Sequence, residues 1–464
     1  METLYWVDFQ RILKMEAIDL FCGCGGFSHG IELSGIEVLY GIDIEEKALK
    51  TFDTNHSKAE AICYDISEEV PAKIAEEDFD VVFGSPPCQG FSHAKGERNE
   101  ADERNNLVFD FVRWIDVLQP EYVIMENVSG IKNISGDFLE QVRERYEEAG
   151  YDIEDGVLNS AEFGVPQSRK RYFTIGVRND VEDYPRLPEP THRLPDDTQA
   201  TFDDLEMKEE TVLVGEALSD LPEPVSEDKT AKLLTEPQNR YQEWVRNGEE
   251  LHNHVAKPPN EDDMEIVERI PEGKMYRSSR FGDMYVQAWE LFEDRFSEEE
   301  QNALWFISRH RTRKSYKATD KNGPDYVPLE KIEAEDEAVR SLFENGWLRR
   351  KTDYGGHNET YDINSKSGVR PKYMRLDRND VSNTLDTHSF NPREKLHPTE
   401  NRGISLREGA RIQSFPDSFV FHGSFKDIAK QIGNAVPPLL SYRVGRFVME
   451  SAEAETDDST PIRI

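Results

Sequence analysis

The sequence predicts an α/β fold built around a mostly parallel sheet with helices on both faces. Over the first 180 residues, short apolar segments alternate with helical stretches, which is the pattern of strand–helix–strand units. The apolar segments are continuous rather than alternating, as expected for strands that are buried on both faces. The predicted strands are residues 17–21, 37–44, 61–66, 80–84 and 122–125, and the first two helices are 27–34 and 45–55.

The alternation stops near residue 178, which predicts a change of domain. We expect a core at residues 1–180, a smaller second domain at 181–374, a return to the core at 375–450 and an acidic tail at 451–464. Residues 181–260 are rich in Pro, Glu and Asp and have little apolar periodicity, so they are predicted to be loop-rich.

Within the second domain, helical patterns at 285–296, 298–309 and 334–345 precede a glycine-turned hairpin at 347–363. Helices followed by a hairpin resemble a winged helix-turn-helix. An ordinary α+β insertion explains the same pattern equally well, and both interpretations stay open.

Composition indicates a reduced, intracellular protein. The four cysteines among 464 residues are too few for a disulfide scaffold and fit no zinc spacing. No run of about 18 apolar residues predicts a membrane span. Residues 1–14 lack a secretory signal, and Met15, just before the first strand, is a second candidate start.

The net charge of −36 opposes binding to a phosphate backbone. One interpretation is that the chain does not bind nucleic acid. The other is that acidic residues coat the outer surface as an adaptation to high salt, while a basic cleft remains. The motifs described below favour the second interpretation.

A glycine-rich segment, residues 22–26, lies between the first strand and the first helix. Glycines there allow a tight turn and a close approach to a ligand, and the helix N-terminus adds a positive dipole end. Asp43 follows 20 residues after Gly23, at the end of the next strand, where a carboxylate can bind ribose hydroxyls. A purely structural turn or a dinucleotide-dependent dehydrogenase would also fit these residues alone.

The segment Gly84-Ser-Pro-Pro-Cys-Gln-Gly-Phe-Ser92 separates these alternatives. Its two prolines stiffen the chain before Cys88 and present the sulfur at a strand tip. A thiolate suits attack on an electron-poor ring carbon. A lone cysteine is otherwise most often a small buried apolar residue.

This segment resembles the catalytic motif of the cytosine-C5 DNA methyltransferase family. Further family-like motifs follow in order at residues 126–128, 167–171, 375–384, 407–416 and 431–438. The resemblance covers roughly residues 16–180 and 370–445. It implies a Rossmann-like methyltransferase core with a smaller target-recognition domain and a cleft between them. Cys22 stands where the family commonly has alanine.

The resemblance also implies the chemistry. Cys88 would attack C6 of a cytosine, Glu126 would hold N3 and the exocyclic amine, and Arg169 and Arg171 would stabilise O2 and orient Glu126. Which arginine does which stays open. The target base must leave the duplex to be reached. The methyl donor would be S-adenosylmethionine, and no metal is needed.

The resemblance implies a cofactor site made of an adenine-stacking Phe21, the glycine loop, a ribose-binding Asp43 and an Asp65 near the adenine amine. Asp65 could equally be a helix cap. The full expected set is Phe21, Gly23, Gly25, Gly26, Asp43, Asp65, Ile66, Pro87, Leu107, Asn434 and Val436.

Double-stranded DNA is the expected partner. Residues 90–106 would close over the flipped base, although an ordinary polar loop would look the same. Arginine pairs bidentately with guanine, so arginines between residues 181 and 374 are candidate base readers. The expected DNA-contacting residues are Gln89, Ser92, Lys95, Arg98, Arg277, Arg280, Arg311 and Arg313.

Two other functions compete with this one. A tRNA-methylating branch shares the scaffold, but Gly90-Phe-Ser92 resembles the DNA branch. A catalytically silent DNA-binding regulator is disfavoured by the presence of Cys88, Glu126 and Arg171. We expect a cytoplasmic, prokaryotic-type monomer without a membrane partner, acting with a cognate restriction endonuclease or as a solitary DNA methyltransferase.

Overall fold

A computed structural model describes residues 14–87, 106–134, 137–195, 208–226, 230–276, 284–309, 336–352, 359–363 and 373–458. The chain forms two compact units. Unit 1 comprises Met1–Val255, Asn379–His388 and Leu406–Ile464, and unit 2 comprises Ala256–Arg378 and Ser389–Ser405. The described helices include none long and apolar enough to cross a bilayer.

Unit 1 is built on a seven-stranded sheet in the order β3-β2-β1-β4-β5-β8-β6. The first five strands in this order are parallel, whereas β8 is antiparallel to both of its neighbours. The predicted α/β fold with a mostly parallel sheet is confirmed. The strands are β1 (Glu16–Leu20), β2 (Glu37–Asp43), β3 (Glu60–Cys63), β4 (Val81–Gly84), β5 (Tyr122–Val128), β6 (Tyr151–Asn159) and β8 (Lys170–Arg178).

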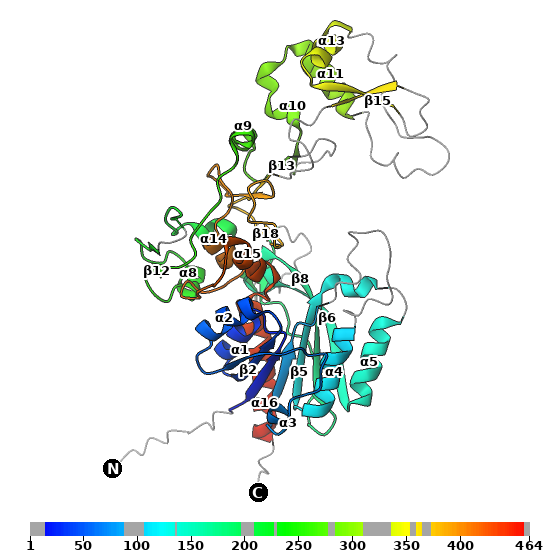
Figure 1. The fold of residues 1–464 in the computed structure, drawn as a ribbon, viewed down its shortest axis with the longest axis vertical. Coiled ribbons are helices and arrows are strands. Elements are labelled where there is room, and N and C mark those ends of the chain that lie inside the picture. Colours follow the sequence, from blue (N-terminus) through cyan, green and yellow to red (C-terminus); the bar gives the residue numbers. More distant parts are fainter. Residues whose placement is uncertain are drawn as a thin grey trace. The chain divides into compact units, whose positions relative to one another are not determined.

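Helices cover both faces of this sheet (Figure 1), with α1 and α16 on one side and α4 and α5 on the other. One apolar cluster lies under α4 and α5 and contains Phe111, Trp114 and Tyr146. The helices flanking the sheet are α1 (Gly26–Ser34), α2 (Glu46–Asn55), α3 (Ala72–Ala75), α4 (Asn106–Leu118), η3 (Ser129–Asn133), α5 (Phe138–Glu148), η4 (Ser160–Phe163) and α16 (Pro438–Asp458).

The C-terminal helix α16 returns to the core by packing closely on α1. A Cβ atom at Gly30 would overlap Ser441 Oγ and the carbonyl oxygen of Pro438, and one at Gly445 would meet Ser34. Glycine at these two places therefore lets the two helix backbones approach. This packing brings the residues that precede α16 to the end of the sheet where α1 begins.

The rest of unit 1 consists of short elements, and those within residues 181–260 agree with the loop-rich segment predicted there. Residues 208–255 belong to unit 1, although we expected the second domain to begin at 181. Buried ion pairs explain this, because Arg411 of α14 bonds to Asp220 and Asp417. These elements are β7 (Gln167–Ser168), β9 (His192–Arg193), β10 (Glu209–Glu210), α7 (Val214–Leu218), β11 (Ala231–Lys232), α8 (Arg240–Val245), β12 (Glu250–Leu251), β18 (Ser382–Asn383), α14 (Leu406–Ile412) and α15 (Phe425–Asn434).

Unit 2 has its own apolar cluster and a small four-stranded sheet, β14-β13-β17-β19. Helices α11 and α13 precede the antiparallel hairpin of β15 and β16, which is the order expected from the sequence. The expected helix at 285–296 is instead divided among β14, α10 and η5. The elements are α9 (Glu261–Arg269), β13 (Met275–Tyr276), β14 (Tyr285–Val286), α10 (Ala288–Leu291), η5 (Glu293–Arg295), α11 (Glu298–Arg309), α13 (Asp336–Glu344), β15 (Leu348–Thr352), β16 (Glu359–Ile363), β17 (Met374–Arg375) and β19 (Lys395–Leu396).

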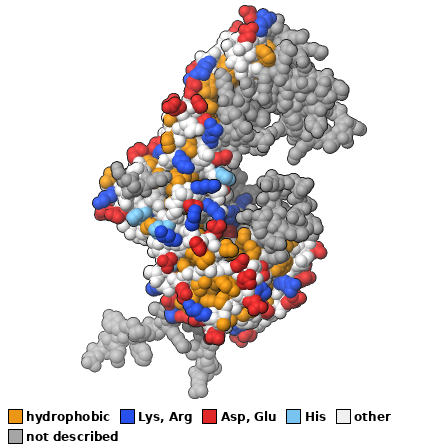
Figure 2. All heavy atoms as spheres, in the orientation of Figure 1, with side chains coloured by type: hydrophobic (Ala, Val, Ile, Leu, Met, Phe, Trp, Pro, Cys, Tyr) orange, Lys and Arg blue, Asp and Glu red, His pale blue; other side chains and the backbone are white. Residues whose placement is uncertain are grey.

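Acidic side chains are spread over the visible surface, with Lys and Arg among them, rather than gathered in one patch (Figure 2). On this face, therefore, the carboxylates do not form a continuous acidic surface.

Candidate active site

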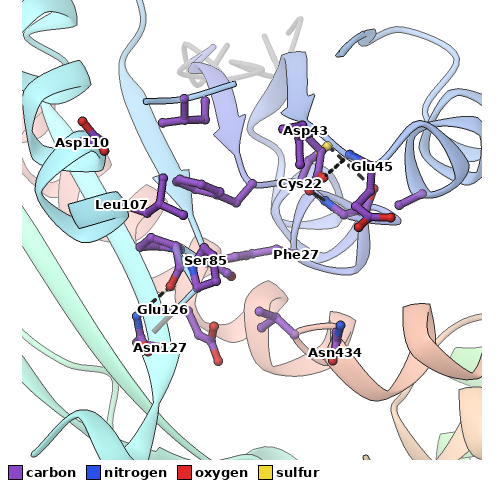
Figure 3. Close-up of a pocket in the computed structure, with 18 of the residues that line it drawn as sticks. Cys22, Phe27, Asp43, Glu45, Ser85, Leu107, Asp110, Glu126, Asn127 and Asn434 are labelled. Atoms are coloured by element: carbon purple, nitrogen blue, oxygen red, sulfur yellow. Dashed lines mark hydrogen bonds between the residues drawn. The ribbon is translucent and has the colours of Figure 1, made fainter. Parts of the chain in front are cut away.

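A large pocket lies in unit 1 at the carboxyl ends of the parallel strands, with a volume of about 1840 Å³. Ligands bind at this edge in open α/β sheets, because loops from adjacent strands diverge there. Loops after β1, β2, β3, β4 and β5 line it, together with α4 and the α15–α16 connection (Figure 3). The pocket thus brings together segments that are more than 400 residues apart in sequence.

The glycine-rich loop turns sharply between β1 and α1. Phe21 and Gly23 both have positive φ values, 70° and 55°, and the backbone N–H groups of Phe21 and Cys22 donate to the carbonyl of Ile42. A Cβ at Gly26 would lie 2.8 Å from the carbonyl oxygen of Val436. The absence of a side chain at Gly26 therefore lets the α15–α16 connection close against the loop.

Gly25 differs from the other predicted cofactor residues, because it does not line the pocket. It has φ 91°, and a Cβ there would overlap the ring of His56 and touch Phe52. His56 is buried, and its Nδ1 lies 2.8 Å from Glu32 Oε2. Packing and a left-handed backbone therefore explain the glycine at this position.

Asp43, the residue expected from the sequence to bind ribose, accepts backbone hydrogen bonds with both of its carboxylate oxygens. Oδ2 accepts from the N–H of Gly23 at 2.8 Å, and Oδ1 accepts from the N–H of Glu45 at 2.8 Å. Burial raises the pKa of Asp43, although these two bonds oppose the shift. Asp43 therefore joins the glycine loop to the start of α2.

Asp65 caps the turn that follows β3. Its Oδ1 accepts from the backbone N–H of Ser67 at 2.9 Å and from the Ser67 hydroxyl at 2.8 Å. This is the capping geometry weighed in the sequence analysis, here in a turn rather than a helix. Asp65 and the buried Ile66 both line the pocket.

Glu126 and Arg171 form the charged centre of the site. Arg171 Nε lies 3.0 Å from Glu126 Oε1, and both side chains are largely buried. Burial raises the pKa of Glu126, whereas the charges of Arg171 and Arg169 lower it. The adjacent Asn127 donates from Nδ2 to the carbonyl of Pro86 at 2.8 Å, which ties β5 to the proline segment before Cys88.

Arg169 has a different set of contacts. It is fully buried and donates from Nη1 to the carbonyl of Leu385 at 2.8 Å and from Nη2 to that of Gly433 at 3.0 Å. Burial lowers its pKa, with a further contribution from Arg171. Of the two arginines, Arg171 pairs with Glu126 and Arg169 fixes the backbone before the α15–α16 connection.

The structure brings most of the predicted cofactor and catalytic residues to one pocket. Many other lining residues were not singled out from the sequence, among them Glu45, Ser85, Asp110 and Arg113. Ser85 stands inside the Cys88 motif, which was a usable signal, whereas Asp110 and Arg113 lie in an ordinary amphipathic helix. The predicted residues that line the pocket are Phe21, Gly23, Gly26, Asp43, Asp65, Ile66, Pro87, Leu107, Glu126, Arg169, Arg171, Asn434 and Val436.

The predicted nucleophile and DNA-contacting residues lie outside the described residues. These are Cys88, Gln89, Ser92, Lys95, Arg98, Arg277, Arg280, Arg311 and Arg313. Pro87, immediately before Cys88, lines the pocket. Among the described side chains, no cluster of His, Cys, Asp or Glu is arranged to hold a metal ion.

Comparison with known proteins gives consistent matches over nearly the whole chain. The C-5 cytosine-specific DNA methylase family matches residues 15–450. The type II methyltransferase M.AgeI of Thalassovita gelatinovora is 31% identical over 461 residues, which cover 94% of this chain and 99% of that protein. M.DdeI of Desulfomicrobium norvegicum is 30% identical over 444 residues, covering 92% and 86% respectively.

The fold is also similar to that of a solved structure. A prophage-encoded protein of E. coli, assigned as a DNA modification methyltransferase, superposes with a TM-score of 0.55. The two chains are 22% identical, and the match covers 95% of this chain and 99% of the other. At this identity the likeness concerns the fold alone.

Proposed function

This chain belongs to the C-5 cytosine-specific DNA methylase family, and on that premise we propose that it methylates duplex DNA through a covalent adduct on Cys88. As a member, it is a DNA (cytosine-5-)-methyltransferase. The observation that carries the proposed mechanism is the buried pair of Glu126 and Arg171 beside the segment that leads to Cys88.

The pocket residues fit S-adenosylmethionine. The exposed Glu45 and Asp65 add carboxylates near Asp43 for hydroxyl and amine groups. Phe21 and Ile66 supply apolar surface for a purine ring. When bound, S-adenosylmethionine supplies an electrophilic methyl group on a sulfonium centre. The amino-acid portion would lie by the glycine loop, with Pro87, Leu107, Asn434 and Val436 enclosing the rest.

Cys88 supplies the electron pair that makes the reaction possible. Its thiolate adds to C6 of the cytosine, which moves electron density toward C5 and N3. Glu126 in its protonated form donates to N3, and Arg171 stabilises the developing charge on O2. After C5 has been methylated, loss of its proton and departure of the Cys88 thiolate restore the aromatic ring.

Glu126 is suited to this role because burial favours its neutral form. The charge of Arg171 opposes that shift, although the pKa of Glu126 stays raised. Arg169 acts on the other side of the site by holding the backbone at Gly433, next to Asn434. Arg171 thus supports activation of the base, and Arg169 supports the shape of the pocket.

The target base must leave the stack to reach this site, at a cost of a few kcal/mol. We propose that Gln89, Ser92, Lys95 and Arg98 contact the DNA around the extruded base. Base reading is assigned to unit 2, with Arg277, Arg280, Arg311 and Arg313 as candidates. We further propose a cytoplasmic monomer that protects DNA from a partner restriction endonuclease, the context that the names of the type II relatives suggest.

A mechanism-based trap tests the proposal. Duplex DNA that contains 5-fluorocytosine, incubated with the protein and S-adenosylmethionine, should give an adduct that survives denaturation, and Cys88→Ser should give none. The absence of an adduct with any DNA would contradict the proposal, and an adduct formed only with fluorinated tRNA would assign the activity to RNA. Bisulfite sequencing of a treated plasmid then reports the base and its sequence context.

A further inference from the structure

Arg113 holds the turn that follows β3. It lies on α4, and its Nη2 atom donates to the carbonyl oxygens of Ile66 and Glu68, both at 2.8 Å. Asp110, one turn earlier on the same helix, lies 3.3 Å from the same nitrogen. A single guanidinium thus joins two backbone carbonyls of one turn to a carboxylate on a helix.

The turn has few other means of holding its shape. Its other bonds are the N–H of Glu68 to the carbonyl of Asp65, at 3.0 Å, the Asp65 cap on Ser67, and the Tyr64 hydroxyl to the carbonyl of Glu69, at 2.8 Å. None of these bonds uses the carbonyls of Ile66 and Glu68, which accept from α4 instead. Ile66 is buried, and a buried backbone acceptor requires a partner, whereas Glu68 is exposed.

Trp114 is the second donor to this turn. Its indole N–H donates to the carbonyl of Ile66 at 2.9 Å, and its side chain is fully buried. Ile66 therefore receives bonds from two consecutive residues of α4. This double attachment fixes the position of the Ile66 side chain, which is buried and lines the pocket.

We propose that Arg113, although it also lines the pocket, is a positioning residue for adenine recognition that acts through the Asp65–Ile66 turn. This inference rests on the proposed function, in which Asp65 and Ile66 bind the adenine of S-adenosylmethionine. The guanidinium sets the turn against α4, which also carries the pocket residues Leu107 and Asp110.

The inference predicts a loss of base discrimination and not a general loss of binding. The bond that the turn would position, from the adenine amine to the Asp65 carboxylate, involves a charged group, and losing one such bond weakens binding about tenfold. Arg113→Met should weaken S-adenosylhomocysteine binding by about that factor. S-inosylhomocysteine lacks the adenine amine, so its weaker binding should change little, and the preference for adenine should shrink accordingly.

The experiment is titration calorimetry of the full chain, without DNA, with the two ligands in turn. Arg143→Met is the matched control, because Arg143 makes a two-bond ion pair with Asp155 that does not involve the β3 turn. The control should keep the wild-type preference. In methylation assays, Arg113→Met should raise the KM for S-adenosylmethionine while kcat stays near wild type.

Equal weakening of both ligands, or an unchanged preference, would overturn the positioning role. Should Arg113→Met fail to fold, Arg113→Lys replaces it, because a lysine keeps the charge but cannot span Asp110 and both carbonyls in the same way. An adenine preference equal to that of the wild type in Arg113→Lys also overturns the inference. If the wild-type chain does not bind S-adenosylhomocysteine, the proposed function fails, and this inference fails with it.

Discussion

Arg171 Nε lies 3.0 Å from Oε1 of Glu126, and the pair spans the two antiparallel strands β5 and β8 at the edge of the pocket. On the backbone, Arg171 is registered opposite Val128, two residues beyond Glu126. The antiparallel pairing of these strands therefore places the Arg171 guanidinium next to the buried carboxyl of Glu126. A pair held in this way restrains the carboxyl orientation before any substrate arrives.

We expect Glu126→Gln to lower kcat about 100-fold or more, because an amide keeps the shape but cannot give up a proton to N3. Binding of S-adenosylhomocysteine should remain at the wild-type level, since the ribose and adenine sides of the pocket are untouched. Single-turnover methylation and calorimetry measure the two quantities. A rate within threefold of wild type would show that Glu126 is not the acid.

The pH dependence follows from the same residue. Burial raises the pKa of Glu126, so the protonated form persists to higher pH than for an exposed glutamate. If that form donates to N3, kcat/KM for DNA should fall as the pH rises through this raised pKa. The Glu126→Gln variant should lack this alkaline limb. An identical limb in both proteins would assign it to another group.

We expect Arg169→Met to lower the free energy of unfolding by about 2 kcal/mol or more, because the substitution leaves two buried carbonyl oxygens without their hydrogen-bond donor. The carbonyls are those of Leu385 and Gly433, on segments far from Arg169 in sequence. Arg171→Met is the matched comparison and should lower kcat with a smaller loss of stability. Urea unfolding and single-turnover rates distinguish the two. Equal losses of stability would contradict the separate roles.

The sequence predicted the edge of the sheet where the site lies, and most of the predicted cofactor and catalytic residues line the pocket there. That success has a physical basis, because glycines, a strand-end aspartate and a proline-stiffened cysteine each leave a local signature. No such local signature indicated that Arg171 pairs with Glu126 or that Arg169 donates to backbone carbonyls. It depends on the β5–β8 register and on segments near residues 385 and 433.

The role of Gly25 and the boundary between the two units also could not be predicted from a local sequence pattern. Gly25 has the spacing of a ligand loop but is explained by the ring of His56, which comes from the end of α2. Residues 208–255 belong to unit 1 because of buried partners such as Asp220 and Arg411, which are 191 positions apart. Long-range polar contacts of this kind determine boundaries that composition alone cannot place.

We expect Gly30→Ala to destabilise unit 1 strongly, by about 3 kcal/mol or more, because the new methyl group overlaps a backbone carbonyl. The overlapping atoms are Ser441 Oγ and the carbonyl oxygen of Pro438, where α1 meets α16. Gly130→Ala is the control, since a Cβ there meets no atom within 4 Å. Thermal unfolding of both variants tests the packing, and a similar midpoint for the two would refute it.

The net charge of −36 leads to a prediction about salt. Salt weakens phosphate contacts, so a typical DNA-binding enzyme loses activity well below molar concentrations. Salt also screens the repulsion among distributed carboxylates, which stabilises a highly acidic fold. If the acidic surface is an adaptation to high salt, the screening of repulsion should outweigh the loss of phosphate contacts. The methylation activity should then peak at a salt concentration of about 1 M.

Initial methylation rates and unfolding midpoints, measured across KCl concentrations, separate these two effects. Under the high-salt interpretation, both should rise together from low salt, because the fold gains stability before DNA binding becomes limiting. An activity optimum near about 0.1 M, with a flat unfolding midpoint, would reject the adaptation and leave the chemistry at Glu126 and Cys88 untouched. The acidic surface would then be a matter of solubility rather than of salt tolerance.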